Sequence, residues 1–383
     1  MKIVNIVGAR PQFIKVAPIL KAIEGHNRAR PDVPIHEVLV HTGQHYDYEM
    51  SQVFFDELGL KAPDYHLGVG SGTHGYQTGE MLKRIEEVLL REKPDWVLVY
   101  GDTNSTLAGA LAAAKLHIRV AHVEAGLRSF NKRMPEEINR ILTDHVSDCL
   151  FCPTETAVQN LAREGITKGV YLVGDVMYDA VQMYLAAAED KSQILETLAL
   201  KPKEYALATV HRAENTDDPE RLRNIMMGLK HIAQDGLRVI FPAHPRTRKA
   251  ISDLSLDISS SNLKVIGPVS YLDMLVLEKN ARVILTDSGG VQKEAFFFRV
   301  PCVTLREETE WVETVEAGWN VLAGCDPERI AHASLAAQCS ASSPYSCSIP
   351  FSPRTPLPPA TPYGDGRAGA RIVMILLECS GRL

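Results

Sequence analysis

The 383 residues are too many for one ordinary hydrophobic core and suit two domains. With 45% hydrophobic and 23% charged residues, the composition is that of a globular protein. A formal net charge of −6 and scattered Lys and Arg residues argue against a nucleic-acid-binding surface.

The first half of the chain alternates short runs of Val, Ile and Leu with amphipathic helical patterns. Strands are predicted at 2–7, 36–41, 96–100, 119–123, 149–152 and 170–173. Helices are predicted between them at 12–24, 48–58, 76–92, 104–115, 136–147 and 155–164. Because such alternation is typical of a parallel sheet covered on both faces, residues 1–175 predict a doubly wound, Rossmann-like domain.

The first predicted strand, Lys2–Val7, starts at the N-terminus. Its pattern is that of a buried strand rather than of a signal peptide. No apolar run approaches the roughly 18 residues that a membrane span needs. We therefore expect a cytoplasmic protein that does not enter a membrane.

A long helical segment, 176–200, and the hinge Lys201-Pro202-Lys203 are predicted to connect this domain to a second one. The strand pattern restarts at Tyr205–Val210. Further strands fit 238–242, 263–266, 282–285, 301–304 and 320–322. Residues 204–338 therefore predict a second Rossmann-like domain. Two doubly wound domains of this kind leave a central cleft where the carboxyl ends of their strands face each other.

Residues 339–362 break the pattern with seven prolines, six serines and a single charge, Arg354. Such a composition predicts an irregular segment, although an altered reading of an ordinary segment stays open. A helix resumes at about 367–378, and residues 366–383 are expected to complete the first domain.

The seven cysteines show no paired ligand spacing. Cys149 and Cys152 spell Cys-x-x-Cys, but Cys-Leu-Phe-Cys is typical of an apolar strand and no second pair lies nearby. We expect neither a metal site nor redox chemistry from them.

Unusual polar residues come directly after the predicted strands, which is where open α/β sheets bind ligands. Gly8-Ala9-Arg10-Pro11-Gln12 follows the first strand and opens a helix, so its backbone N–H groups and Arg10 could bind an anion. A plain strand–helix turn with a solvated Arg10 is the equal alternative. His41-Thr42-Gly43-Gln44-His45 ends the next strand and adds two imidazoles to that rim.

Gly70, Gly72 and Gly75 formally spell Gly-x-Gly-x-x-Gly. The residues before them do not form a convincing strand, so a mobile loop is the preferred interpretation over a dinucleotide fingerprint. We therefore expect no NAD, and no other cofactor.

Three acidic positions stand out in the first half. Asp102 follows the strand at 96–100, where it could simply cap the next helix. Glu124 ends the strand at 119–123, and a buried carboxylate there needs a partner, for which Arg128 is the structural candidate. Glu136 and Glu137 open the helix at 136–147, where one of them could serve as ordinary capping.

The second half repeats the arrangement with basic residues. His211-Arg212-Ala213-Glu214-Asn215 follows one strand and His244-Pro245-Arg246 follows the next. Asp287-Ser288-Gly289-Gly290 then joins a strand to a helix. A Ser-Gly-Gly helix start can hold a pyrophosphate through its hydroxyl and N–H groups. Glu294, one and a half turns later, could accept hydrogen bonds from a ribose diol.

Taken together, these motifs resemble the non-hydrolysing UDP-N-acetylglucosamine 2-epimerase family. The segments that agree in order and spacing are Gly8–Lys15, Gly101–Ser105, His122–Ser129, Pro135–Arg140, His211–Asn215 and Asp287–Ala295. The resemblance runs from residue 1 to about 338 and resumes at 362–366. It implies the two-domain GT-B fold, a UDP-binding second domain, a homodimer and a place in polysaccharide biosynthesis.

The resemblance also implies roles for individual residues. The reaction centre would contain Asp102, Glu124, Glu136 and His211. Substrate-binding residues would be Arg10, Lys15, His244, Ser288, Gly289, Gly290, Glu294 and Arg306. Among these, Ser288–Gly290 would hold the phosphates, Glu294 the ribose, and Arg10 and Arg306 the diphosphate or uridine. Many members bind a second, activating UDP-GlcNAc, and the departures at Asp47 and 68–75 argue against that here.

The implied reaction interconverts UDP-GlcNAc and UDP-ManNAc. The C2 hydrogen is too weakly acidic for simple removal, because no carbonyl adjoins it. Elimination of UDP gives a 2-acetamidoglucal, and re-addition with protonation from the opposite face inverts C2. This needs acid/base groups on both faces and stabilisation of the leaving diphosphate. A GT-B glycosyltransferase, a hydrolysing epimerase and a silent nucleotide-sugar sensor stay open as alternatives.

Overall fold

The computed structural model describes residues 1–44, 55–254, 261–340 and 362–382. The chain forms two compact units, each built around its own parallel sheet. Unit 1 comprises Met1–Met183 and the described C-terminal residues, and unit 2 runs from Tyr184 to residue 340. The Pro/Ser-rich stretch predicted to be irregular lies almost entirely outside the described residues.

The sheet of unit 1 has, within the described residues, seven parallel strands in the order β3-β2-β1-β4-β5-β6-β7. They are β1 Lys2–Val7, β2 His36–His41, β3 Tyr65–His66, β4 Trp96–Tyr100, β5 Arg119–Val123, β6 Cys149–Cys152 and β7 Val170–Leu172. All strands predicted in this half are confirmed to within one residue. The edge strand β3 escaped prediction because two residues carry no periodic pattern.

The helices of unit 1 cover both faces of this sheet. They are α1 Arg10–Ala29, α3 His74–Glu92, α4 Asn104–Lys115, α5 Pro135–Val146, α6 Glu155–Arg163 and α16 Ala368–Cys379. The helix predicted at 48–58 lies mostly outside the described residues. One face packs Val4, Ile6 and Val99 against Met81 of α3 and Ala110 of α4.

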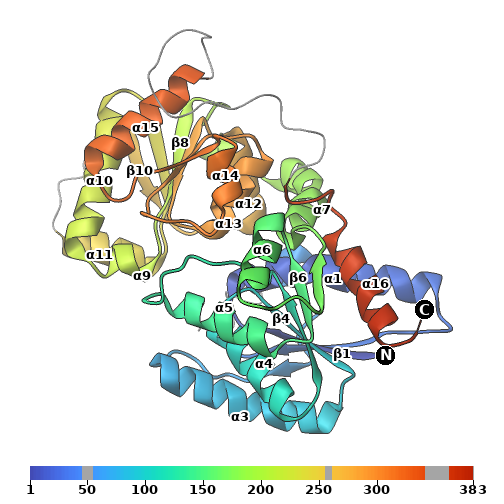
Figure 1. Cartoon of the computed structure of the whole chain (residues 1–383). Coiled ribbons are helices and arrows are strands. Elements are labelled where there is room, and N and C mark those ends of the chain that lie inside the picture. The colour runs from blue at the N-terminus through green and yellow to red at the C-terminus, as the bar shows by residue number, and fades with distance from the viewer. Residues whose placement is uncertain (45–54, 255–260, 341–361, 383) are drawn as a thin grey trace. The chain divides into compact units, whose positions relative to one another are not determined.

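The C-terminal helix α16 packs beside α1 of the same unit, as Figure 1 shows. The backbones approach closely, since a Cβ on Gly369 would lie 2.9 Å from the Pro18 carbonyl oxygen. Asp179 accepts hydrogen bonds from the amides of Ala368 and Gly369, at 3.1 and 2.8 Å, and so holds the start of α16. This side chain lies on α7, Val176–Lys191.

The predicted continuous helix over 176–200 is wrong, because α7 ends at Lys191. The Ser192 hydroxyl donates to Asp273 and accepts from the amide of Ile194, at 2.5 and 3.3 Å. A short helix, α8 Ile194–Thr197, follows this turn. Ser readily makes such local side-chain bonds, which compete with helix continuation.

Unit 2 repeats the architecture with, in its described part, six parallel strands in the order β10-β9-β8-β11-β12-β13. They are β8 Tyr205–Thr209, β9 Arg238–Pro242, β10 Leu263–Ile266, β11 Val283–Thr286, β12 Cys302–Thr304 and β13 Asn320–Leu322. The predicted strands are again confirmed to within one residue. The helices are α9 Ala213–Thr216, α10 Pro219–Gln234, α11 Pro245–Asp253, α12 Tyr271–Asn280, α13 Gly289–Phe297, α14 Val312–Glu316 and α15 Pro327–Ser340.

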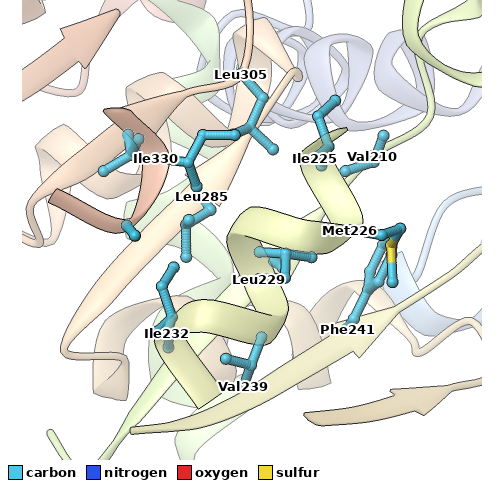
Figure 2. Packing of buried hydrophobic residues seen from close by; sticks show 14 of the residues in the cluster. Val210, Ile225, Met226, Leu229, Ile232, Val239, Phe241, Leu285, Leu305 and Ile330 are labelled. Atoms are coloured by element: carbon cyan, nitrogen blue, oxygen red, sulfur yellow. The ribbon is translucent and has the colours of Figure 1, made fainter. Parts of the chain in front are cut away.

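Alternate residues of the unit 2 strands face opposite cores. Ala206 and Ala208 of β8 face a cluster that α10 and α15 cover, whereas Tyr205 and Leu207 face one that α12 and α13 cover. Figure 2 shows the first cluster, in which α10 directs Met226 toward Phe241. A sheet buried on both faces is typical of doubly wound proteins and explains the near-continuous hydrophobic strands.

Both sheets reverse their strand order at one point, between β1 and β4 in unit 1 and between β8 and β11 in unit 2. Helices leave such a point toward opposite faces, so a crevice opens at the carboxyl ends of the two central strands. The sequence motifs Gly8–Gln12 and Gly101–Asn104 lie at the first point, and His211–Asn215 and Asp287–Gly290 at the second. In the described residues no helix is long and apolar enough to cross a membrane.

Candidate active site

The turn after β1 is tied to the turn after β4 by Gln12. Its Oε1 accepts hydrogen bonds from the amides of Gly8 and Ala9, at 2.7 and 3.0 Å. Its Nε2 donates to the carbonyl oxygen of Tyr100 at 2.8 Å and to Thr106 Oγ1 at 3.0 Å. The amides of Gly8 and Ala9 are therefore already used within the protein, whereas the predicted anion contact of Arg10 stays a prediction. The half-buried Arg10 at the start of α1 keeps its positive charge near this turn.

Neighbouring strand ends pack tightly against Gly8. A Cβ at this position would lie 2.1 Å from Thr42 Oγ1 and 2.2 Å from Ser105 Oγ, so only glycine fits. The imidazole of His41 is fully buried, accepts from the Gly43 amide and stacks on His66. It does not reach the rim where we expected it. His45, the second imidazole predicted there, lies outside the described residues.

Asp102 is held by a cation rather than used as a helix cap. Thr103 caps α4 by accepting from the Thr106 amide. Asp102 Oδ2 instead accepts from Arg140 Nε at 3.1 Å and Nη2 at 2.6 Å. Asn139 Nδ2 donates to the Asp102 carbonyl oxygen at 2.9 Å, so α5 fixes both the backbone and the side chain of this residue.

Glu124 adopts a left-handed backbone conformation with a φ of 72°, which is rare outside glycine. Such strained positions concentrate at functional sites. Its Oε2 lies 2.7 Å from Lys15 Nζ, and both side chains are about nine-tenths buried. Arg128, the partner we considered, instead binds Asp144 and Glu164. Lys15 thus neutralises the buried carboxylate.

The two glutamates that open α5 have different environments. Glu137 is buried, accepts from the amides of Ser129 and Phe130 at 2.9 and 2.8 Å, and pairs with Arg140 at 2.8 Å. Glu136 is half-exposed in the first turn of the helix. Glu137 therefore has the structural task that the sequence assigned to one of the pair, whereas Glu136 keeps part of its side chain exposed.

His122, Asp144 and Arg128 form a buried network of hydrogen bonds and ion pairs next to the turns that carry Asp102 and Glu124. His122 Nδ1 lies 2.7 Å from Asp144 Oδ1, and His122 Nε2 lies 2.7 Å from the carbonyl oxygen of Gly101. Asp144 Oδ2 accepts from Arg128 at 2.7 Å and from the Gly126 amide at 3.1 Å. Burial would raise the pKa of Asp144, but the hydrogen bonds and charges of His122 and Arg128 outweigh it and leave this pKa lowered.

The Gly-rich segment after β3 is anchored to the neighbouring strand end. The amides of Val69 and Gly70 donate to the carbonyl oxygens of Thr42 and Gly43, at 3.0 and 2.9 Å. The segment is a loop, as predicted, and these bonds anchor its first residues, while its mobility stays a prediction. The segment follows the edge strand β3 rather than a strand at the switch point, where dinucleotide fingerprints lie.

In unit 2, Asp287 organises the turn after β8. This fully buried carboxylate accepts from the amides of His211 and Arg212, at 3.1 and 3.0 Å, and from Asn215 Nδ2 at 3.1 Å. His211 Nδ1 lies 3.3 Å from Asp287 Oδ1, while about half of the His211 side chain is exposed. The imidazole is therefore oriented by Asp287 and accessible to a ligand.

The helix after β11 begins with two glycines whose amides point out of its first turn. Ser288 caps α13 by accepting from the Val291 amide, and Gly289 and Gly290 are the first residues of the helix. Amides at these positions have no acceptor within the helix. A Cβ on Gly289 would lie 2.9 Å from Trp311 Nε1, which explains glycine there.

Three further predicted ligand residues are already engaged by protein groups. Glu294 is buried and accepts from the Tyr271 hydroxyl at 3.1 Å. Arg306, with 1% of its side chain exposed, pairs with Glu310 at 3.0 Å and with Glu214 at 3.2 Å. Direct contact of Arg306 with a ligand would require the Glu214 pair to open. His244 is exposed and caps α11 by accepting from the Arg246 amide.

Sequence reasoning assigned no role to four residues that hold the candidate site together. They are Gln12, Arg140, Asp144 and Asp287. Only Asp287 lay at the end of a strand, where its position could have drawn attention. The others sit inside helices, where polar residues of this kind are usually solvated. Within the described residues, no group of three or more His, Cys, Asp or Glu side chains could hold a metal ion.

Comparison with known proteins places these motifs in context. A family profile described as UDP-N-acetylglucosamine 2-epimerase matches residues 27–377. A UDP-N-acetylglucosamine 2-epimerase homolog from Methanococcus maripaludis is 60% identical over 334 residues, which cover 86% of this chain and 90% of that protein. A UDP-2,3-diacetamido-2,3-dideoxy-D-glucuronate 2-epimerase from Pseudomonas aeruginosa is 52% identical and covers 87% and 91%.

Solved structures show the same fold. The crystal structure of the Methanocaldococcus jannaschii UDP-GlcNAc 2-epimerase, in complex with UDP-GlcNAc and UDP, superposes with a TM-score of 0.88. That match is 47% identical and covers 99% of this chain and 100% of the other. A spinosyn rhamnosyltransferase superposes with a TM-score of 0.51 at 10% identity over 88% of this chain and 91% of its own, a likeness of fold alone. The predicted fold class, two Rossmann-like domains of the GT-B type, is confirmed.

Proposed function

The chain belongs to the UDP-N-acetylglucosamine 2-epimerase family, a family of isomerases, and we propose that it interconverts UDP-GlcNAc and UDP-ManNAc. The reaction proceeds by elimination of UDP and its re-addition, with a 2-acetamidoglucal between the two steps. We further propose that the enzyme acts as a homodimer in the cytoplasm and serves polysaccharide biosynthesis. It uses no NAD, because no step transfers a hydride.

We assign the nucleotide half of the substrate to unit 2. The pyrophosphate would accept hydrogen bonds from Ser288, Gly289 and Gly290, where the positive end of the α13 dipole adds to the attraction. Glu294 would accept from the ribose hydroxyls, with Tyr271 holding its carboxylate in place. Arg306 and His244 complete this proposed set.

We assign the reacting sugar to the carboxylates of unit 1. Asp102 follows β4 and Glu124 follows β5, and each is paired with a buried cation. Glu136 lies in the first turn of α5. Arg10 would contact the diphosphate, and Lys15 would hold the carboxylate of Glu124 in position. Asp102 and Glu124 are the candidates for the base that takes the C2 hydrogen.

In the forward step a carboxylate takes the C2 proton and becomes a carboxylic acid. The C2–H electrons form the C1=C2 bond, and the C1–O bond breaks with its electron pair on the β-phosphate oxygen. In the return step that oxygen attacks C1 while a second acid protonates C2 from the opposite face. His211 would stabilise the charge that develops on the leaving phosphate, because Asp287 orients its ring.

The observation that carries this proposal is that the two switch points carry different kinds of polar groups. The turn after β11 opens a helix with Ser-Gly-Gly, to which we assign the pyrophosphate, whereas unit 1 carries carboxylates paired with cations. A glycosyltransferase needs the first but has no use for three acids on the other unit. A sensor that only binds the nucleotide has no use for them either.

The direct test is incubation of the purified chain with UDP-GlcNAc alone in D2O. We expect deuterium at C2 of both UDP-GlcNAc and UDP-ManNAc by NMR, with no release of UDP. Glu124→Gln should abolish the exchange and retain UDP binding, while the exposed Glu24→Gln serves as the matched control. Free ManNAc with stoichiometric UDP would identify a hydrolysing epimerase, and the absence of deuterium would refute epimerisation.

A second substrate is favoured by one comparison. The Pseudomonas aeruginosa relative is named for UDP-2,3-diacetamido-2,3-dideoxy-D-glucuronate and is 52% identical, against 48% for the Methanocaldococcus jannaschii UDP-N-acetylglucosamine 2-epimerase. The two sugars share the chemistry at C2 and differ at C3 and C6. Measuring kcat/KM with both nucleotide sugars decides between them, and the D2O exchange serves for either.

A further inference from the structure

His122 lies at the centre of a buried network that links the turns carrying Asp102 and Glu124. The ring is fully buried in β5, between Asp144 Oδ1 and the carbonyl oxygen of Gly101, each at 2.7 Å. Gly101 directly precedes Asp102 and has a φ of 64°. A carbonyl oxygen in such a turn is aimed by the backbone conformation, so the bond from His122 fixes that conformation.

The partners of the ring fix its orientation. A carbonyl oxygen can only accept, so Nε2 must donate to Gly101. Asp144 Oδ1 lies against the other ring nitrogen, and Asp144 Oδ2 accepts from Arg128 and the Gly126 amide. Both nitrogens of the ring are therefore held by neighbouring groups.

Charged groups of the neighbouring elements hold Asp144, and through it the ring, in place. Helix α5 contributes Asp144, and it also contributes Arg140, which holds Asp102. Arg128 lies on the segment after β5 and pairs with both Asp144 and Glu164 at the end of α6.

The same network also holds the turn that carries Glu124. Asp144 Oδ2 accepts from the Gly126 amide, two residues after Glu124. The Gly101 amide donates to the Val123 carbonyl oxygen at 3.0 Å, so the two turns are hydrogen-bonded to each other. A Cβ on Gly126 would lie 2.4 Å from the Ala157 carbonyl oxygen, so this turn packs closely against α6 and requires glycine.

We propose that His122, held in place by Asp144, is a positioning residue that fixes the Gly101–Asp102 turn for proton transfer at C2. This inference rests on the proposed epimerase function. Loss of the ring N–H removes the restraint on the Gly101 carbonyl, and the carboxylate of Asp102 shifts relative to the sugar. A displacement of about 1 Å at a reacting group costs on the order of 10²-fold in rate.

The kinetic test compares His122→Asn with His145→Asn. His145 lies on α5 next to Asp144, is exposed, and bonds only to the Ile141 carbonyl among the contacts described, so it is the matched control. We expect kcat for His122→Asn to fall roughly 10²-fold with KM and UDP affinity unchanged. The control should keep the wild-type kcat.

A double-mutant cycle shows whether His122 acts through Asp102. If it does, His122→Asn adds no further loss of deuterium exchange to an Asp102→Asn background. Multiplying losses, or an increase in KM that matches the loss of kcat, would overturn the proposal. Wild-type protein that fails to exchange deuterium at all would instead refute the proposed function.

The hydrogen bond from the ring is measurable in the wild-type protein, without any variant. Imidazole ¹H–¹⁵N NMR should show an Nε2–H of His122 that exchanges slowly with solvent, because the ring is fully buried and bonded to the Gly101 carbonyl oxygen. If this N–H exchanges as fast as that of the exposed His145, the proposal fails whatever the enzyme catalyses. This result stays informative even if His122→Asn does not fold.

Discussion

Replacing Lys15 with Met should destabilise unit 1 strongly, because it leaves the buried Glu124 carboxylate without its cation. Lys15 Nζ and Glu124 Oε2 are 2.7 Å apart, with only 11% and 7% of the two side chains exposed. Removing one partner of a buried ion pair typically costs about 3–5 kcal/mol, since the other charge stays buried without compensation. Met has a similar volume to the Lys stem, so little of the loss should come from a cavity.

The double variant Lys15→Met/Glu124→Gln should recover most of that stability. Replacing both partners removes the unpaired charge, and neutral substitutes for buried pairs are often tolerated. Lys21→Met, on the exposed face of the same helix, should change stability by less than about 0.5 kcal/mol.

Native-state hydrogen exchange of the β1 and β4 amides is the suitable assay, because it reports on unit 1 separately from unit 2. Protection factors for the four proteins give the free energy of opening directly. A loss below about 1 kcal/mol for Lys15→Met would show that the carboxylate is solvated and that the pairing argument is wrong. Failure of the double variant to recover would show that Lys15 acts through packing instead.

Three further results are expected. Glu137→Gln should lower the melting temperature, because it weakens the bonds to the Ser129 and Phe130 amides and to Arg140. The control Glu136→Gln should leave the melting temperature unchanged and reduce only kcat. Gly289→Ala should destabilise unit 2 by about 1–3 kcal/mol in urea unfolding, because its Cβ would lie 2.9 Å from Trp311 Nε1. The control Gly25→Ala should stabilise α1 slightly, because no atom lies within reach of the added Cβ. Burial raises the pKa of Asp179 from 3.8 to about 6, so the native state binds this proton more tightly. The wild type should therefore lose about 2 kcal/mol of stability as the pH rises from 4 to 6. Asp179→Asn should lack that slope, and an identical pH profile for the variant would contradict it.

Much of the fold was predictable because the strands carry their signal locally. Buried runs such as Trp96–Tyr100 and Tyr205–Thr209 are hydrophobic on both faces and sit between turn residues, so their bounds were correct to within one residue. The edge strand β3 and the break at Ser192 were missed, because two residues and one hydroxyl leave no periodic trace. The family resemblance was confirmed because it rested on several motifs in register rather than on one.

The partners of the candidate site residues could not be predicted in the same way. Gln12 bonds to Tyr100 across 88 positions of the chain, and His211 bonds to Asp287 across 76. A sequence gives the residue types at both ends of such a bond but not the register that joins them. Arg128 illustrates the difficulty, since it was the nearest cation to Glu124 in the sequence, yet the fold brings Lys15 there instead.

The two units show how one topology can be equipped for two tasks. Each sheet places a glycine-containing turn at its switch point, where a ligand would meet backbone amides. In unit 1 the side chain of Gln12 takes the amides of Gly8 and Ala9, so this turn has lost much of its capacity for phosphate. In unit 2 the amides of Gly289 and Gly290 open a helix and have no acceptor within it.

Gln12→Ala should therefore release two amides and create weak phosphate affinity in unit 1, detectable as phosphate-dependent shifts of the Gly8 and Ala9 amide resonances. If those resonances respond to phosphate equally in the wild type, saturation by Gln12 is not what distinguishes the two turns.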